Sequence, residues 1–322
     1  MNVLSCFDGM SCGQIALNKA GVDYSAYYAS ELDKYAIQVT QANYPHTVQL
    51  GDVRSVDPLA LPKIDLLIGG SPCQGFSFAG KQLNFEDPRS KLFFDFVRLK
   101  ETLKPKYFLL ENVRMSKQSK DIISEYMGCE PVAINSALVS AQSRQRLYWT
   151  NIPFTMPEDK GIVLGDILED KVHSKYFAGK ALQDNYAGGN QLNPKYKSQA
   201  NTIHCSKEKF GTLCAGTHGY ANGYVNKPIQ VNPSKKAGGK QPYIQDRVFS
   251  KQGKSHALTA SFASRTNVDD NGFRKLTPLE CERLQTVPEG YTNHVSNTQR
   301  YKMLGNGWTV DVITTILEGI NK

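Results

Sequence analysis

The sequence lacks three features, and each absence excludes a class of protein. No apolar run approaches the roughly 20 residues that span a bilayer. The first residues, MNVLSCFDGM, have no basic segment followed by a long apolar one, as a secretory signal would. The seven cysteines include no CxxC pair, which disfavours a zinc cluster or a disulfide framework. We therefore expect a cytoplasmic protein with free thiols, no bound metal and no membrane association.

Acidic residues are scarce in one segment. Residues 170–255 hold fourteen Lys or Arg and only four Asp or Glu, a net charge of +10, whereas the other 236 residues together carry −2. Such a basic block inside an otherwise neutral chain favours a polyanionic partner such as nucleic acid. The alternative is a lysine-rich surface that only keeps the protein soluble.

Residues 1–155 alternate short apolar stretches with amphipathic ones. This alternation predicts an α/β fold, a doubly wound and mostly parallel sheet with helices on both faces. The predicted strands are NVLSCF, YYASEL, VQLGDV, IDLLIGG, YFLLEN, EPVAINS and RLYWTNI, and the predicted helices between them include CGQIALNKAG and SKLFFDFVRLKETLKP.

The composition changes after about residue 160. Residues 170–255 are rich in Gly, Asn, Lys and Gln, but they also contain nine aromatic residues, which argues against a disordered insertion. We predict a smaller, strand-rich domain at 161–264, and a main domain formed by 1–160 together with 265–322. In the last part, TPLECERLQTVP predicts a helix capped at Thr277 with Glu280 in capping-box spacing, and a final helix is expected from Asn306 to Ile320.

Polar residues follow the first three predicted strands. The loop FDGMSCG contains Gly9 and Gly13, which let the backbone approach a ligand, although the spacing is not that of a dinucleotide fingerprint. Glu31 ends the next strand at the position where a carboxylate holds ribose hydroxyls in doubly wound folds. Asp52 follows the third strand and can accept a hydrogen bond from an adenine amino group. Together they indicate a nucleoside cofactor at the sheet edge.

A reactive group is predicted at the same edge. Cys73, in GGSPCQGF, follows the fourth strand in a turn stiffened by proline, and Glu111 ends the fifth. In AQSRQRLYW the alternation of Gln142, Arg144 and Arg146 predicts that all three face one side. Each has a plainer interpretation: a buried cysteine, a capping or ion-pairing carboxylate, and structural or phosphate-binding arginines.

These motifs, in this order, resemble those of the cytosine-C5 DNA methyltransferases. The matching stretches are FDGMSCG, SPCQGFS, ENV, QSRQR, RKLTPLECERLQTVPEGYT and YKMLGNGWTVDVI, and they cover nearly the whole chain. FDG and GDVR are similar to the branch that includes animal de novo enzymes and many bacterial and phage ones. The first loop departs from the family, since many members have a glycine two places earlier, and Cys12 is expected to alter the cofactor contacts.

The resemblance implies a mechanism. The enzyme would flip a cytosine out of duplex DNA, and the Cys73 thiolate would add to C6 so that C5 becomes nucleophilic. Glu111 would hold N3 and the exocyclic amine, and Arg144 would bind O2. Arg146 would tie the site together or touch phosphate. A base, expected to be water, would then remove the C5 proton.

The resemblance also implies S-adenosyl-L-methionine as cofactor and double-stranded DNA as partner. Trp308 departs from the family pattern, in which small residues are common at this position. We expect it either to pack against the methionine end of the cofactor or to fill the core. Two Thr-Leu pairs could seat the displaced strand, and the one at Leu258-Thr259 is favoured over Thr212-Leu213. The implied cofactor contacts are Phe7, Gly9, Ser11, Glu31, Asp52, Val53, Pro72, Leu92, Asn306, Trp308 and Val310, and the implied DNA contacts are Gln74, Ser77, Gln142, Thr212 and Thr259.

Three other functions were weighed. A tRNA-acting branch uses the same chemistry, but its Cys-Phe-Thr signature does not occur here. An inactive DNA-binding accessory protein would be expected to lack the cysteine or the ENV glutamate. The glycine pattern does not fit a nicotinamide oxidoreductase. We expect a monomeric bacterial or phage enzyme for restriction-modification or phage self-protection, in the first case beside a cognate restriction endonuclease, with a target site that the sequence does not reveal.

Overall fold

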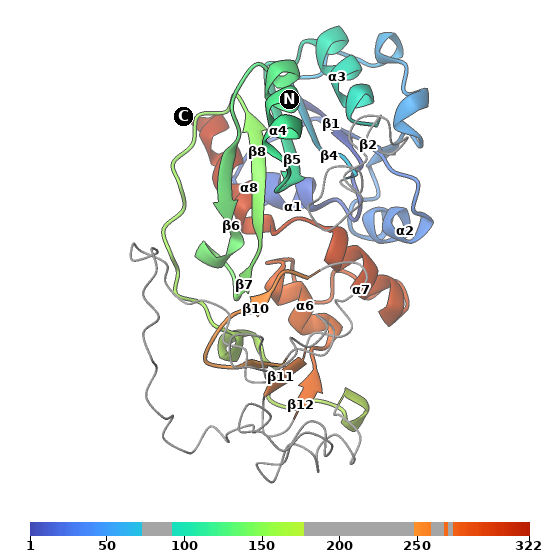
Figure 1. Ribbon diagram of the computed structural model, residues 1–322. Helices are drawn as coiled ribbons and strands as arrows, with labels where there is room; N and C mark the ends of the chain where they lie inside the picture. Colours follow the sequence, from blue (N-terminus) through green and yellow to red (C-terminus); the bar gives the residue numbers. More distant parts are fainter. Residues whose placement is uncertain (73–91, 177–247, 259–266, 270–272) are drawn as a thin grey trace.

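The computed structural model describes residues 1–72, 92–176, 248–258, 267–269 and 273–322 (Figure 1). Its main feature is a seven-stranded sheet with the order β3-β2-β1-β4-β5-β8-β6. Neighbouring strands are parallel except that β8 runs antiparallel to both β5 and β6. The predicted α/β fold with a mostly parallel sheet is therefore confirmed. The strands are β1 (Asn2–Cys6), β2 (Ala26–Ser30), β3 (Val48–Gln49), β4 (Leu66–Gly70), β5 (Tyr107–Val113), β6 (Val132–Asn135) and β8 (Gln145–Thr150).

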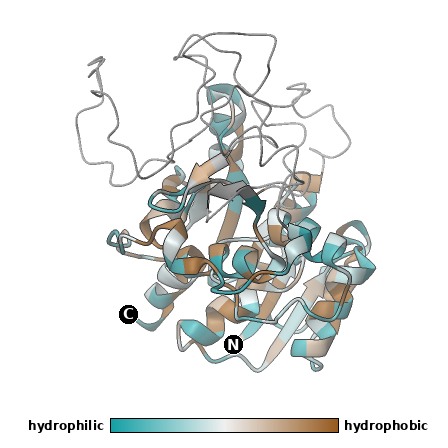
Figure 2. Cartoon of the chain, turned by 90° about the horizontal axis from the view of Figure 1, so that it is seen from below, coloured by the Kyte–Doolittle hydropathy of each residue, from teal (hydrophilic) through white to brown (hydrophobic). Residues whose placement is uncertain are grey.

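Both faces of the sheet are buried. Along β1, Val3 belongs to one apolar cluster while Leu4 and Cys6 belong to another, as expected for side chains that alternate across a strand. The first cluster includes residues of α1 (Cys12–Lys19), α2 (Lys34–Asn43) and α8 (Val310–Leu317), and the second includes residues of α3 (Leu92–Leu103) and α4 (Lys117–Met127). Figure 2 shows the same distribution, with hydrophobic residues along the strands and hydrophilic ones on outer helix surfaces.

The C-terminal helices match the prediction in part. Helix α6 (Pro278–Leu284) begins after Thr277, whose hydroxyl accepts from the Glu280 N–H at 3.2 Å while the Glu280 carboxylate accepts from the Thr277 N–H at 2.7 Å. This capping box is confirmed. The predicted start of the final helix is wrong, because Asn306 ends α7 (Asn297–Asn306) and α8 begins only at Val310.

Side chains stabilise the break between α7 and α8. Backbone carbonyls at the end of α7 accept hydrogen bonds from side chains: Gln285 Nε2 donates to the Leu304 carbonyl at 2.6 Å, and Arg144 Nη2 donates to the Gly307 carbonyl at 3.0 Å. These bonds satisfy carbonyls that the end of a helix leaves without an intrahelical partner. The residues between the two helices are therefore held in an extended segment that carries Trp308.

Further strands lie at the other end of the molecule in Figure 1. A three-stranded sheet has the order β12-β11-β9, and β10 pairs with β7. Most of 161–264 falls outside the described residues, so the second domain stays a prediction. These strands are β7 (Gln142–Ser143), β9 (Val248–Ser250), β10 (Ser255–His256), β11 (Asn267–Asp269) and β12 (Phe273–Lys275), and the 3-10 turns are η1 (Val53–Ser55), η2 (Pro58–Ala60), η4 (Ser136–Leu138), η5 (Leu164–Ile167), η6 (Ser174–Tyr176) and η11 (Glu318–Asn321).

Backbone hydrogen bonds join residues 164–165 to residues 251–253. The Leu164 N–H donates to the Gly253 carbonyl at 2.7 Å, and the Gly165 N–H donates to the Lys251 carbonyl at 2.6 Å. Residues 164–165 therefore lie beside residues 251–253. Among the described residues, no helix combines the length and apolar character needed to cross a bilayer.

Strand order determines where a ligand can bind. The chain winds from β1 outward to β2 and β3, then returns to β4 on the other side of β1. At such a reversal the loops after the two central strands diverge and leave a crevice at their carboxyl ends. The loops after β1 and β4 hold the FDG and SPC motifs.

Candidate active site

A cavity of about 700 Å³ opens at this edge of the sheet. Its walls come from the loops after β1, β2, β4 and β5, from β8, and from the segment before α8. Residues of the FDG, SPC, ENV, QSRQR and GNGW motifs therefore converge on it, whereas Gly13, Asp52 and Gln142 do not line it. The lining includes Phe7, Glu31, Pro72, Glu111, Arg146 and Trp308.

The first loop has an unusual backbone. Phe7, Gly9 and Ser11 have positive φ angles of 59°, 59° and 63°. Two of these residues carry side chains, which makes the left-handed conformation costly and ties it to the surrounding structure. Glu31 holds the loop in this shape, because its Oε2 accepts from the Gly9 N–H at 2.7 Å.

Gly13 has a different role from the one expected. A Cβ at Gly13 would lie 2.5 Å from Ile68 Cδ1 and 2.6 Å from Tyr27 Oη. Its lack of a side chain lets α1 pack closely on the sheet. Gly13 does not line the cavity, so a ligand approach is not its role in this structure.

Asp8 lines the cavity and was missed by sequence reasoning. Tyr27 Oη donates to its Oδ1 at 2.8 Å, whereas its buried Oδ2 has no hydrogen-bond partner among the described residues. Burial raises the pKa of Asp8 to about 6, against the opposing effect of the nearby Ser5, Ser11 and Tyr27 hydroxyls. The aspartate of the FDG motif was the available signal.

The two carboxylates predicted to bind a nucleoside differ in position. Glu31 lines the cavity, and its Oε1 also accepts from the backbone N–H groups of Leu32 and Asp33 at 2.7 and 2.8 Å. Asp52 does not line it. Its carboxylate pairs with Arg54, which lowers the pKa of Asp52 through their hydrogen bonds.

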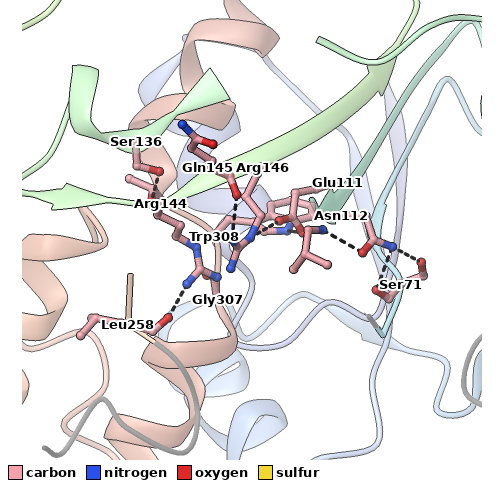
Figure 3. A network of polar contacts seen from close by, with 12 residues as sticks. Ser71, Glu111, Asn112, Ser136, Arg144, Gln145, Arg146, Leu258, Gly307 and Trp308 are labelled. Carbon is pink, nitrogen blue, oxygen red and sulfur yellow. Dashed lines mark hydrogen bonds and ion pairs between the residues drawn. The ribbon is translucent and has the colours of Figure 1, made fainter. Parts of the chain in front are cut away.

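Glu111 is held from two sides (Figure 3). Arg146 Nε lies 3.0 Å from its Oε1, and Trp308 Nε1 donates to its Oε2 at 3.2 Å. The side chains of Glu111 and Arg146 are only 11% and 15% exposed. A paired, largely buried carboxylate at a cavity wall can bind a ligand that offers a planar set of donors.

Arg144 is turned toward backbone carbonyls instead. Its guanidinium donates to the carbonyls of Leu258 at 2.5 Å and Gly307 at 3.0 Å, and more weakly to that of Gly305 (Figure 3). Burial, and then the positive charge of Arg146, lower the pKa of Arg144 to about 9, so the group stays charged at neutral pH. Arg144 joins the C-terminal segment to the chain near β10.

Gln142 is not available to DNA in this structure. It is fully buried, and its amide donates to the Leu284 carbonyl and to Gln285 while accepting from the Leu258 N–H. Gln142 and Arg144 nevertheless face one side, since both bond to Leu258, and Arg144 and Arg146 both line the cavity. Gln142 itself does not line it.

The ENV motif also positions the SPC loop. Asn112 Nδ2 donates to the hydroxyl and carbonyl oxygens of Ser71 at 3.0 and 3.4 Å. Both residues are buried, so the start of that loop is tied to β5. Pro72 lines the cavity directly before position 73. Cys73, Gln74, Ser77, Thr212 and Thr259 lie outside the described residues.

The remaining predicted cofactor residues divide into two groups. Phe7, Gly9, Glu31, Pro72, Asn306 and Trp308 line the cavity. Ser11, Val53 and Val310 are buried away from it, and Leu92, at the start of α3, does not line it either. None of the described residues form a group of three or more His, Cys, Asp or Glu side chains that could hold one metal ion.

Comparison with known proteins decides the family. The model of the C-5 cytosine-specific DNA methylase family matches residues 1–322. The chain belongs to this family. The type II methyltransferase M.HpaII of Haemophilus parainfluenzae is 30% identical, over 96% of this chain and 86% of its own length. M.NlaX of Neisseria lactamica is 28% identical, over 98% and 95%.

The fold agrees with that of solved methyltransferases. The structure of the Entamoeba histolytica methyltransferase EhMeth superposes with a TM-score of 0.70 at 14% identity, covering 99% of this chain and 97% of that one. Membership of the methylase family makes the chain a DNA (cytosine-5-)methyltransferase that depends on S-adenosylmethionine and takes DNA as substrate. The predicted family, enzyme class and function are thus confirmed.

Proposed function

We propose that this methyltransferase flips a cytosine out of duplex DNA into the cavity beside Glu111 and Arg146 and methylates it at C5 through a covalent adduct with Cys73. One observation carries the proposal. The Glu111–Arg146 pair lies in the wall of the same cavity whose opposite part is formed by Glu31 and the FDG loop. A base and a nucleoside cofactor can thus meet in one space.

The base would be held by complementary donors and acceptors. Cytosine presents N3, an exocyclic amine and O2 along one edge. We assign Glu111 to N3 and the amine. We favour Arg146 over Arg144 for O2, because both terminal nitrogens of Arg144 donate to backbone carbonyls, whereas among the described residues Nη2 of Arg146 has no hydrogen-bond acceptor.

The covalent step would belong to Cys73. Its thiolate forms a bond to C6 while the C5–C6 π electrons move toward C5. A proton held between Glu111 and N3 neutralises the ring, and the exocyclic amine donates to the same carboxylate. After C5 is methylated, a base removes the C5 proton, the C5–C6 double bond re-forms and the thiolate leaves. Pro72, in the cavity wall directly before Cys73, supports this placement.

S-adenosylmethionine supplies the methyl group as a sulfonium electrophile when bound. We propose that Glu31 holds ribose hydroxyls and that Phe7, Pro72 and Trp308 form apolar walls around it. Asp52 is left out of this set, because its carboxylate is paired with Arg54 outside the cavity.

DNA recognition is assigned to residues 161–264. The support is the net charge of +10 over 170–255. We propose a monomeric enzyme with one target sequence, acting in restriction-modification or in phage self-protection. The relatives M.HpaII and M.NlaX are named type II methyltransferases, and a Bacillus phage relative is named an orphan methyltransferase.

Bisulfite sequencing tests the proposal. Plasmid DNA from a methylation-free bacterial host expressing the chain would be compared with DNA from hosts expressing Cys73→Ser and Glu111→Gln. Protection of cytosines in one short motif, lost in both variants, is the expected result and also supplies the target. Full conversion with a folded, cofactor-binding protein would contradict a DNA substrate, and the same assay on host tRNA would follow.

A further inference from the structure

We propose that Trp308 is a positioning residue: its indole N–H fixes the carboxylate of Glu111 for the base. This inference rests on the proposed function of Glu111. Each Glu111 oxygen has its own donor, Arg146 Nε at 3.0 Å for Oε1 and Trp308 Nε1 at 3.2 Å for Oε2 (Figure 3). Among the described residues, Trp308 is the protein donor bonded to Oε2. Without this hydrogen bond, the Glu111 carboxylate could rotate about its Cγ–Cδ bond and lose the orientation that the base requires.

The indole is itself held in place. Its neighbour Gly307 accepts at its carbonyl from Arg144 at 3.0 Å and from Gln285 at 3.3 Å. The Cys12 thiol lies 3.8 Å from the Trp308 carbonyl, in hydrogen-bonding geometry. The backbone on both sides of Trp308 is therefore held in place. Its indole N–H has a fixed position before the base binds, as a group that orients a catalytic side chain must.

Gly70 provides the space for this contact. It lies directly opposite Glu111 in the register of β4 and β5. A Cβ at Gly70 would be 2.9 Å from Trp308 Nε1 and 3.0 Å from Glu111 Oε2. Any side chain there would push on both partners at once, so the three residues are fitted to one another.

Trp308 is also proposed above as an apolar wall for the cofactor. The two roles predict different losses. A wall that only packs against the cofactor would, when altered, weaken cofactor affinity. A donor that orients Glu111 would, when removed, slow the reaction at saturating cofactor and DNA while cofactor affinity stays the same.

The sharpest test replaces Trp308 by β-(3-benzothienyl)alanine, in which sulfur takes the place of the indole N–H and the ring system keeps its size. The chain offers a matched control in its other tryptophan. Trp149 is fully buried, and its Nε1 donates to Ser124 Oγ at 3.0 Å, away from the cavity. The same replacement at Trp149 removes an equivalent buried hydrogen bond.

We expect the variant at 308 to turn over about tenfold more slowly, the usual effect of losing one hydrogen bond to a charged group. Its dissociation constant for S-adenosylmethionine should stay within about twofold of wild type. The variant at 149 should keep wild-type turnover. Trp308→Phe, which also lacks the N–H, should reproduce the loss of turnover if the modified protein does not fold.

Wild-type turnover in the folded variant at 308 would overturn the inference. So would a loss accounted for entirely by weaker cofactor binding. A wild-type enzyme that methylates no DNA would instead contradict the proposed function, so the two failures are distinguishable.

Discussion

At the residue scale, Asp8 combines a buried carboxyl oxygen that has no hydrogen-bond partner among the described residues with a negative neighbour in Glu31. A carboxyl group whose pKa is higher in the folded than in the unfolded chain favours folding at low pH, and this contribution is lost as pH rises through the folded value. For Asp8 this stabilising contribution is lost between about pH 4 and about pH 6.

We predict that Asp8→Asn loses this dependence. A pKa of 3.8 in the unfolded chain and of about 6 in the folded chain corresponds to a change in the free energy of unfolding of about 3 kcal/mol at most. Relative to wild type, the variant should gain stability on going from pH 4 to pH 7.5, which urea unfolding at the two pH values measures. Titration of the other carboxyl groups cancels in this comparison. An equal stability difference at both pH values would contradict the prediction.

Trp308 also offers a reporter of cofactor binding. Trp149 belongs to the apolar cluster on the α3 side of the sheet, whereas Trp308 lines the cavity. In a Trp149→Phe protein, we expect S-adenosylmethionine to change the remaining tryptophan emission. A Trp308→Phe protein should bind the cofactor with no such change, and the reverse pattern would place the cofactor elsewhere.

Sequence patterns predicted the positions of some site residues, but for others they predicted only that a residue of that kind would be near the site. Glu31 directly follows β2 and Glu111 lies near the end of β5, and strand ends meet at one edge, so their convergence could be predicted. The division of roles between Arg144 and Arg146 could not. Alternation along a strand assigns a face, but it does not reveal which guanidinium meets a carboxylate and which meets backbone carbonyls.

At the element scale, the extended segment before α8 depends on Arg144. We predict that Arg144→Met lowers the free energy of unfolding by about 3–5 kcal/mol, because it removes a buried charge that several carbonyls surround. It should also weaken S-adenosylmethionine binding, since this segment carries Asn306 and Trp308 of the cavity wall. Urea unfolding and calorimetric titration measure the two effects.

The matched control is Arg54→Met. Arg54 pairs with Asp52 but its side chain is 67% exposed, so the loss should be far smaller than that of Arg144→Met. Similar losses for the two variants would show that the carbonyl contacts of Arg144 contribute no more than a surface ion pair.

The elements themselves were predictable to different degrees. Buried strands such as β1, β4 and β5 are short apolar runs bounded by polar turns, which the sequence displays directly. The break between α7 and α8 falls at Asn306-Gly307, a turn signal that the prediction of one helix from Asn306 passed over. The bonds of Gln285 and Arg144 to carbonyls there join residues distant in sequence and were not predictable.

At the scale of the whole molecule, the charge distribution predicts strongly salt-dependent DNA binding. If six or more of the basic residues in 170–255 neutralise phosphates, affinity should fall by about a thousandfold between 50 and 200 mM salt. Fluorescence anisotropy with a labelled duplex measures this fall, and S-adenosylmethionine affinity over the same range is the control. A shallow dependence would mean that these lysines only cover a solvated surface.

The hydrogen bonds that join Leu164 and Gly165 to the chain at Lys251 and Gly253 have an evolutionary consequence. These bonds use backbone groups that any sequence provides, so the chain between them can change in length or sequence while the junction is kept. Under the proposal that 161–264 reads DNA, an exchange of that stretch by recombination would change the target sequence in one step.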